Sequence, residues 1–176
     1  MTTVLPVWTL GMALPKHRHK VLTRAINREL DRANDSGLMY NTKEDEGLLY
    51  KIELNAALIA HDEFSSEDLD EFSEVIPDIM LFHQNSYALS KVKESVAGFP
   101  DLVIEVWSNS NSDMERNFKR VLYSTGIGTE HWYLTQTSNV VECWFESEKL
   151  PDQSLENILI TKNGIHIDLR SLSLAD

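Results

Sequence analysis

The segment PDLVIEVW, residues 100 to 107, most constrains the fold, because it places two carboxylates in an otherwise apolar run. Its Leu, Val, Ile and Trp residues predict a strand buried inside a sheet. Side chains two residues apart share a strand face, so Asp101 and Glu105 with their even spacing point to the same side. A buried carboxylate is costly unless an arginine, a set of hydrogen-bond donors or a metal ion compensates it. The two acids therefore predict a site on this strand.

Upstream of this strand, the sequence predicts a helix and further strands. Apolar residues recur at helical spacing over residues 16 to 33, and basic residues dominate the first turns. Residues 47 to 60 have the alternation of one or two strands, and VIPDIMLFH at 75 to 83 predicts a central strand that begins near Pro77. The polar residues 84 to 98 predict a connector between this strand and the next.

Downstream, residues 108 to 126 predict a helix that begins at a Ser, Asn or Asp cap and ends at a glycine. Residues 130 to 147 predict a hairpin. The tail offers two short strands joined by Asn163 and Gly164, a dipeptide with a strong preference for hairpin turns. This order, with few helices and several strands, predicts an α/β or α+β sheet in a single domain over residues 1 to 176.

Composition and charge narrow the class of protein. The 176 residues are 42% hydrophobic, which is enough for one compact core. The net charge of -12 argues against a general polyanion-binding protein, although residues 16 to 24 and 116 to 120 are locally basic. The acidic residues 61 to 74 predict a solvated loop or short helix. With one cysteine, Cys143, and no apparent signal or membrane helix, we expect a soluble cytoplasmic protein.

A third acid, Asp78, lies near the start of another apolar strand. A divalent cation would relieve the repulsion among clustered acids, and magnesium prefers one or two carboxylates together with waters and a substrate phosphate. Such an ion activates water and neutralises charge at a phosphoryl centre, while a nearby lysine steadies the transition state. Lys119, on the predicted helix after Glu105, is the candidate for that lysine.

Pro77 and Asp78, followed by Glu105 on the next apolar strand, resemble the motif of the PD-(D/E)XK nuclease superfamily. The lysine of that motif usually lies two residues after the glutamate, where this chain has Trp107. We expect Trp107 to be a core or interface residue, because it belongs to an alternating strand pattern. Another residue must therefore supply the positive charge.

A closer resemblance extends over residues 77 to 134, which contain PDLVIEVWSNSN, then Lys119 four residues before Tyr123, then GIGTEHWYL. This pattern resembles a bacterial family of uncharacterised putative restriction endonucleases within the same superfamily. In that family the lysine has moved from the strand to the following helix. The resemblance therefore implies that Lys119 replaces the lysine of the strand.

The resemblance implies a restriction-endonuclease-like α/β (α+β) fold, in which helices flank a mixed central sheet and additional β-hairpins are attached. Asp78 and Glu105 would hold Mg²⁺ or Mn²⁺, and Lys119 would be the catalytic cation. The implied activity is metal-dependent hydrolysis of phosphodiester bonds in DNA. We also expect a homodimer, because nucleases that cut both strands often pair two sites.

Asp101, Glu29 and His19 are secondary candidates for the site. Asp101 matches a frequent acid of the family, but at the first residue of its strand it could instead cap or pair. Glu29 is either the helix glutamate that some nucleases add to the metal site or an exposed helix residue. His19 resembles a family histidine at the start of the first helix. Glu115, in the first turn of the second predicted helix, is explained by a capping or dipole role.

The main trio also has structural interpretations. Asp78 fits a strand-entry acid bonded to nearby backbone. Glu105 fits a buried salt bridge to Lys119 or Arg116. Thr135 stands where the family usually has a carboxylate, and the family pattern before the first helix is not recognisable here. A nuclease-like binding or interaction module, catalytically weak or inactive, is therefore the second hypothesis.

Overall fold

The computed structural model describes the chain in several stretches separated by gaps. The described residues are 8–33, 39–41, 47–50, 73–83, 90–92, 95–97 and 99–174. Side chains are described for residues 18–33, 75–82 and 99–174. The predicted strand residues 51–60 and most of the acidic segment 61–74 lie outside this part of the chain.

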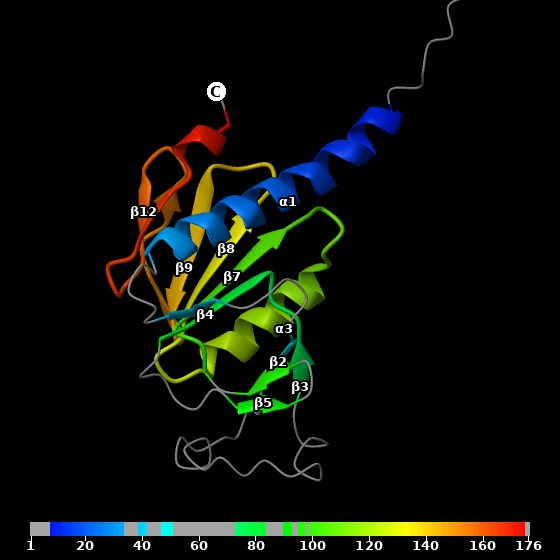
Figure 1. Ribbon diagram of the computed structural model, residues 1–176. Helices are drawn as coiled ribbons and strands as arrows, with labels where there is room; N and C mark the ends of the chain where they lie inside the picture. The colour runs from blue at the N-terminus through cyan, green and yellow to red at the C-terminus, as the bar shows by residue number, and fades with distance from the viewer. Residues whose placement is uncertain are drawn as a thin grey trace, which may run out of the picture.

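A mixed seven-stranded sheet forms the centre of the molecule (Figure 1). Its strand order is β1-β4-β7-β8-β9-β10, and β11 also pairs with β9. The pairing of β7 with β8 is parallel, and the other pairings are antiparallel. The strands are β1 (Met39–Asn41), β4 (Ile79–His83), β7 (Leu102–Trp107), β8 (Glu130–Thr135), β9 (Val140–Phe145), β10 (Glu148–Lys149) and β11 (Gln153–Ser154). The apolar strand predicted at residues 100 to 107 is thus β7, in the middle of this sheet.

Two helices pack on opposite faces of β7. Helix α1 (Trp8–Ala33) crosses one face of the sheet, and α3 (Asp113–Ser124) lies against the other (Figure 1). One core cluster joins α1 residues such as Leu22 and Ile26 to Ile104, and the other joins Val103 to Tyr123 of α3. Alternate residues of β7 therefore face different helices, as the strand period requires.

Two smaller sheets complete the described fold. Four short strands pair in the order β3-β2-β6-β5, and β12 pairs with β13 as a hairpin. These strands are β2 (Gly47–Tyr50), β3 (Ser73–Val75), β5 (Ser90–Val92), β6 (Ser95–Ala97), β12 (Ile158–Ile160) and β13 (His166–Asp168), and the 3-10 helix η2 (Arg170–Leu172) follows. The turn between β12 and β13 contains Gly164 at φ +79°, a conformation that favours glycine. The predicted Asn-Gly hairpin is confirmed.

Two predicted boundaries need correction, and a third is confirmed. Residues 84 to 98 were expected to form only a connector, but they contain β5 and β6. Each of these strands has three residues, which is too short to show a strand period in a polar sequence. The central strand expected to begin near Pro77 is confirmed as β4, which begins at Ile79, while the residues before the proline belong to the separate strand β3. Helix α1 begins earlier than residue 16, although Pro15 is unfavourable inside a helix.

Candidate active site

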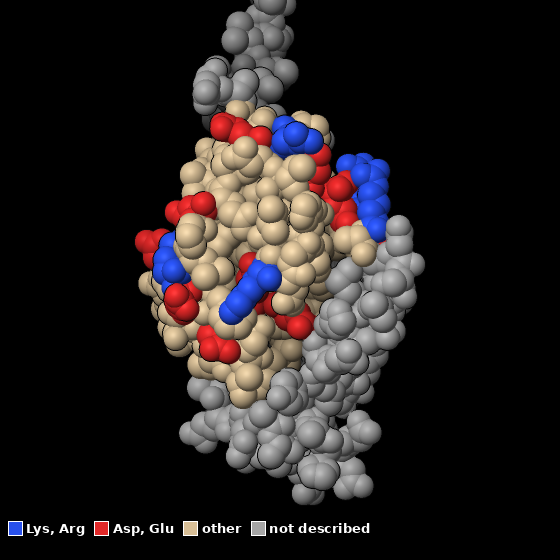
Figure 2. All heavy atoms as spheres, turned by 90° about the vertical axis from the view of Figure 1, so that its left-hand side faces the viewer, with Lys and Arg blue, Asp and Glu red and all other residues tan. Residues whose placement is uncertain are grey.

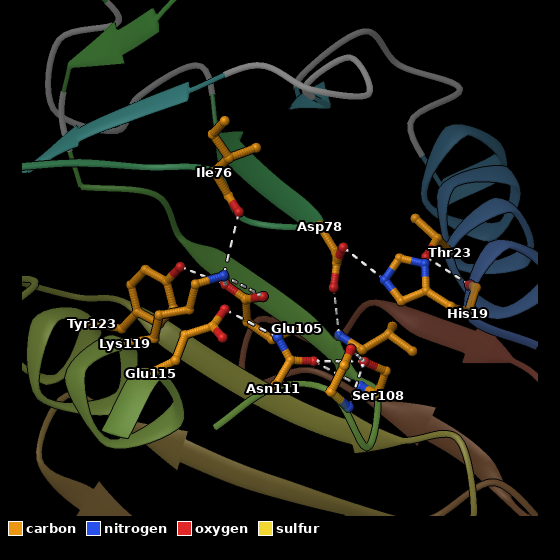
Figure 3. A network of polar contacts seen from close by, with 12 residues as sticks. His19, Thr23, Ile76, Asp78, Glu105, Ser108, Asn111, Glu115, Lys119 and Tyr123 are labelled. Carbon is orange, nitrogen blue, oxygen red and sulfur yellow. Dashed lines mark hydrogen bonds and ion pairs between the residues drawn. The ribbon is translucent and has the colours of Figure 1, made fainter. Parts of the chain in front are cut away.

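Glu105 is a buried carboxylate in the middle of β7, with 2% of its surface exposed. It points toward α3, where the Lys119 ammonium lies 2.8 Å from its Oε1 and 3.0 Å from its Oε2. The Tyr123 hydroxyl donates a hydrogen bond of 2.6 Å to Oε1 (Figure 3). Lys119 and Tyr123 are four residues apart, so both project from one face of α3. One helix face therefore supplies both donors to Glu105.

The loop between β7 and α3 fixes the start of that helix. Ser112 is the N-cap, and its Oγ accepts a 3.1 Å hydrogen bond from the Glu115 amide. Asn111 accepts from the Ser108 amide at 2.8 Å and donates to the Glu115 carboxylate at 3.0 Å. Arg116 donates to the Ser108 carbonyl at 2.8 Å. These contacts hold the first turn of α3 near the end of β7, with Ser112 as the cap and the Glu115 carboxylate bound to the Asn111 side chain.

Asp78 lies next to Glu105, because its side chain binds the backbone amide of Val106, the residue after Glu105. In the pairing of β4 with β7, Ile79 lies opposite Ile104. Just before Ile79, the Asp78 Oδ2 accepts a 2.7 Å hydrogen bond from the backbone amide of Val106 on β7. Its Oδ1 is 2.9 Å from Nε2 of His19 on α1. In Figure 3, His19 and Lys119 approach the two carboxylates from opposite sides. Asp78 and Glu105 thus form a pair flanked by one residue from each helix.

Burial and mutual repulsion shape the protonation of this pair. Burial, reinforced by the charge of Asp78, raises the pKa of Glu105 to about 7, although Lys119 and Tyr123 oppose this rise. Burial and the adjacent Glu105 raise the pKa of Tyr123 well above its usual value. The hydrogen bond to Asp78 is the main reason that the pKa of His19 is raised. Up to about pH 7, the pair therefore favours a proton on Glu105.

The secondary candidates fall at different distances from this pair. His19 belongs to the site through its contact with Asp78. Asp101 precedes Glu105 by four residues, which is about 13 Å along an extended strand. Glu29 follows His19 by ten residues, about 15 Å along α1, and pairs with Arg32 there. The structure thus brings His19 together with the main trio, and places Asp101 and Glu29 away from it.

Comparison with known proteins identifies the family of the chain. The model of the Uma2 family, described as a putative restriction endonuclease, matches residues 12–173 of the chain. The chain belongs to the Uma2 family. The resemblance inferred from the sequence is therefore confirmed, over a longer part of the chain than the motifs alone covered.

A solved structure supports the fold of this Uma2 family member. It is a crystal structure described as a putative nuclease belonging to DUF820 from Anabaena variabilis ATCC 29413. The two structures superpose with a TM-score of 0.59 at 10% sequence identity. The superposition covers 89% of this chain and 82% of that chain. At such low identity the likeness shows the fold, and it confirms the predicted restriction-endonuclease-like class. None of the curated proteins searched matches the chain.

The donor set of this Uma2 site fits a hard divalent cation held by two carboxylates. Within the described residues, no three His, Cys, Asp or Glu side chains gather closely enough to bind an ion. Among the described residues, each Asp78 oxygen has one hydrogen-bond partner and Oε2 of Glu105 is bonded to Lys119, so lone pairs remain for a metal. Mg²⁺ needs only one or two carboxylates when waters and a phosphate complete its shell. Asp78 and Glu105 meet that requirement.

Two residues around the trio show what the sequence did and did not reveal. Tyr123 contacts Glu105 directly, yet in the sequence it served only to mark the spacing from Lys119. That four-residue spacing was the available signal for a shared role. Trp107 is buried and stacks on Tyr133 with ring centroids 4.4 Å apart, and the Arg120 guanidinium lies 4.7 Å from its ring centroid. Trp107 is a core residue, as predicted, and leaves the charged role to the helix.

Proposed function

We propose that this Uma2 family member is a metal-dependent nuclease that hydrolyses phosphodiester bonds in DNA, with Asp78, Glu105 and Lys119 as its catalytic residues. The observation that carries the proposal is the buried Glu105, which lies next to Asp78 and within 3.0 Å of the Lys119 ammonium. Two carboxylates and one lysine at this spacing suit a phosphoryl centre better than a purely structural core. Family membership supports the nuclease class.

Each side chain has a distinct part in this proposal. Asp78 and Glu105 would hold Mg²⁺ or Mn²⁺, which when bound supplies charge neutralisation and an activated water. Lys119 places its positive charge where charge develops on the scissile phosphate. Tyr123 orients Glu105 through Oε1, and His19 orients Asp78 through Oδ1. The positioning residues therefore fix the carboxylates, and the lysine faces the substrate.

Cleavage of supercoiled, linear and single-stranded DNA with Mg²⁺ or Mn²⁺ tests this proposal. Asp78→Asn, Glu105→Gln and Lys119→Met should each lower the cleavage rate about a hundredfold or more, because the first two weaken the metal site and the third removes the positive charge at the scissile phosphate. Lys162→Gln, a change of an exposed lysine outside the site, should retain the wild-type rate. The proposal is wrong if the wild type cleaves no DNA or RNA form and binds no metal that Glu105→Ala weakens.

A second candidate function is a binding module that keeps the acids as a structural network. The observation in its favour is the Lys119–Glu105 ion pair, which already compensates much of the carboxylate charge from within the protein. Thr135, in register with Trp107 at the end of β8, supplies no carboxylate. The homodimer, the cytoplasmic location and the preference for DNA stay predictions. Among the described residues, no helix has the length and apolar character needed to cross a membrane.

A further inference from the structure

A polar pocket of about 350 Å³ opens on the α1 side of Asp78. Its walls come from the polar side of α1 and from the segment between β3 and β4. The lining residues are His19, Lys20, Thr23, Arg24, Asn27, Ile76, Pro77 and Asp78. The volume lies at the lower end of the range for ligand pockets, which suits one nucleotide unit better than a large cofactor. Because Asp78 belongs to both, this pocket and the candidate active site are continuous.

The polar wall of the pocket is a regular stripe on α1. Lys20, Thr23, Arg24 and Asn27 follow the spacing i, i+3, i+4, i+7 and therefore share one helix face. The core face of α1 is formed by other residues, including Leu22, which is fully buried. The stripe is thus separate from the apolar surface that docks α1 on the sheet.

The stripe is positively charged, although the chain as a whole is negatively charged. The chain carries a net charge of -12, yet Lys20 and Arg24 are exposed and form no ion pair with any other described residue. Further along α1, Arg32 pairs with Glu29. The face in Figure 2, at the left side of Figure 1, likewise shows Lys and Arg beside Asp and Glu rather than a continuous basic patch. Two cations that lack a counter-ion among the described residues, next to the carboxylate pair, favour an anionic ligand.

We propose that this pocket binds the backbone phosphate next to the scissile phosphate of a DNA strand, with Lys20 and Arg24 as the phosphate ligands. This inference rests on the proposed nuclease function and adds the path of the strand. Lys119 and Glu105 lie on one side of Asp78 and the pocket lies on the other, so a strand that spans Asp78 reaches both. Lys20 and Arg24 are one turn apart, about 6 Å along the helix axis, so both reach the same stretch of backbone.

The test measures binding of a short fluorescein-labelled DNA duplex by anisotropy in EDTA over a series of salt concentrations. Binding in EDTA needs no cleavage and so separates the pocket from the chemistry. Lys20→Gln/Arg24→Gln should weaken binding about tenfold and flatten the plot of log K against log salt by about two units, because two phosphate contacts are lost. The same change of slope is expected for kcat/KM when cleavage with Mg²⁺ is followed.

Lys149→Gln/Lys162→Gln is the matched control, because it removes the same charge from exposed lysines of β10 and the β12–β13 hairpin. It should lower affinity and slope far less than the α1 variant, and thermal melting should show that both variants fold. If the two double variants lose affinity equally, or the α1 variant matches the wild type, the pocket proposal is overturned while the nuclease function stands. If the wild type neither binds nor cleaves DNA, the proposed function itself fails.

Discussion

Glu105 is buried and lies next to a second carboxylate, Asp78, and both features change the pKa of its side chain. Its pKa is raised to about 7 by burial and by Asp78, against the opposing effects of Lys119 and Tyr123. An isolated core acid would be expected to lose its charge, whereas this one keeps a lysine and a phenol within 3.0 Å. The sequence pointed to Glu105, because an acid in an apolar strand is conspicuous, and the family resemblance pointed to Lys119. The sequence did not identify the Val106 amide that donates to Asp78 or the Ile76 carbonyl that accepts from Lys119, because backbone groups carry no sequence signal.

The raised pKa of Glu105 predicts a specific pH dependence of stability. The folded protein retains the Glu105 proton up to about pH 7, whereas the unfolded chain loses it near the ordinary value of 4.5. The stabilisation from this group is therefore complete below about pH 4.5 and is lost as the pH rises through about 7. Relative to Glu105→Gln, the wild type should lose on the order of 3 kcal/mol of unfolding free energy across this window in EDTA. Urea denaturation of both proteins measures this, and a difference that stays constant or grows with pH would contradict the assignment.

At the scale of elements, the sequence predicted those parts whose local pattern is strong. β7, the β8–β9 hairpin, α3 and the Asn-Gly hairpin all occur where the apolar period, the cap and the turn residues indicated. The short strands β5 and β6 escaped prediction, because each is stabilised by pairing with a distant partner and not by its own period. The local sequence pattern therefore predicts the long elements, whereas the short strands are recognised only from their pairing in the structure.

The N-cap of α3 should be measurable as a contribution to stability. Ser112 accepts the Glu115 amide at 3.1 Å, and the same helix carries Lys119 and Tyr123 to Glu105. Ser112→Ala should lower the unfolding free energy by about 1 kcal/mol, because a helix-start amide loses its acceptor. Ser112→Asp keeps an acceptor and should remain close to the wild type. Urea midpoints compare the three proteins, and equal losses in both variants would show that the hydroxyl does not act as a cap.

At the scale of the whole molecule, the site depends on segments that are far apart in the chain. His19 comes from α1, Asp78 from the start of β4, Glu105 from β7 and Lys119 from α3. The family resemblance gave the order of three of these residues, and only the fold shows that all four meet. Single-sequence periodicity contains no distances between segments, so the pocket on α1 could not be predicted, although its basic residues were noted.

Metal binding should distinguish the two candidate functions through stability alone. A cation held by Asp78 and Glu105 binds only the folded chain, so Mg²⁺ at about a hundred times its Kd should add about 2.7 kcal/mol to the unfolding free energy. For a protein of this size that corresponds to a rise in Tm of roughly 5 to 10 °C. Differential scanning calorimetry with Mg²⁺ and with EDTA measures the rise, and Asp78→Asn/Glu105→Gln should abolish it.

Lys119→Met makes the same experiment sharper, because Lys119 competes with the cation for the oxygens of Glu105. If the carboxylates form a metal site, this variant should show at least the wild-type rise in Tm, since the repulsion between Asp78 and Glu105 is then left for the ion to relieve. If the acids instead form a structural network, Mg²⁺ should leave the Tm of the wild type and of the variant unchanged. Loss of the lysine would then only destabilise the fold, because Glu105 would remain buried without its cation.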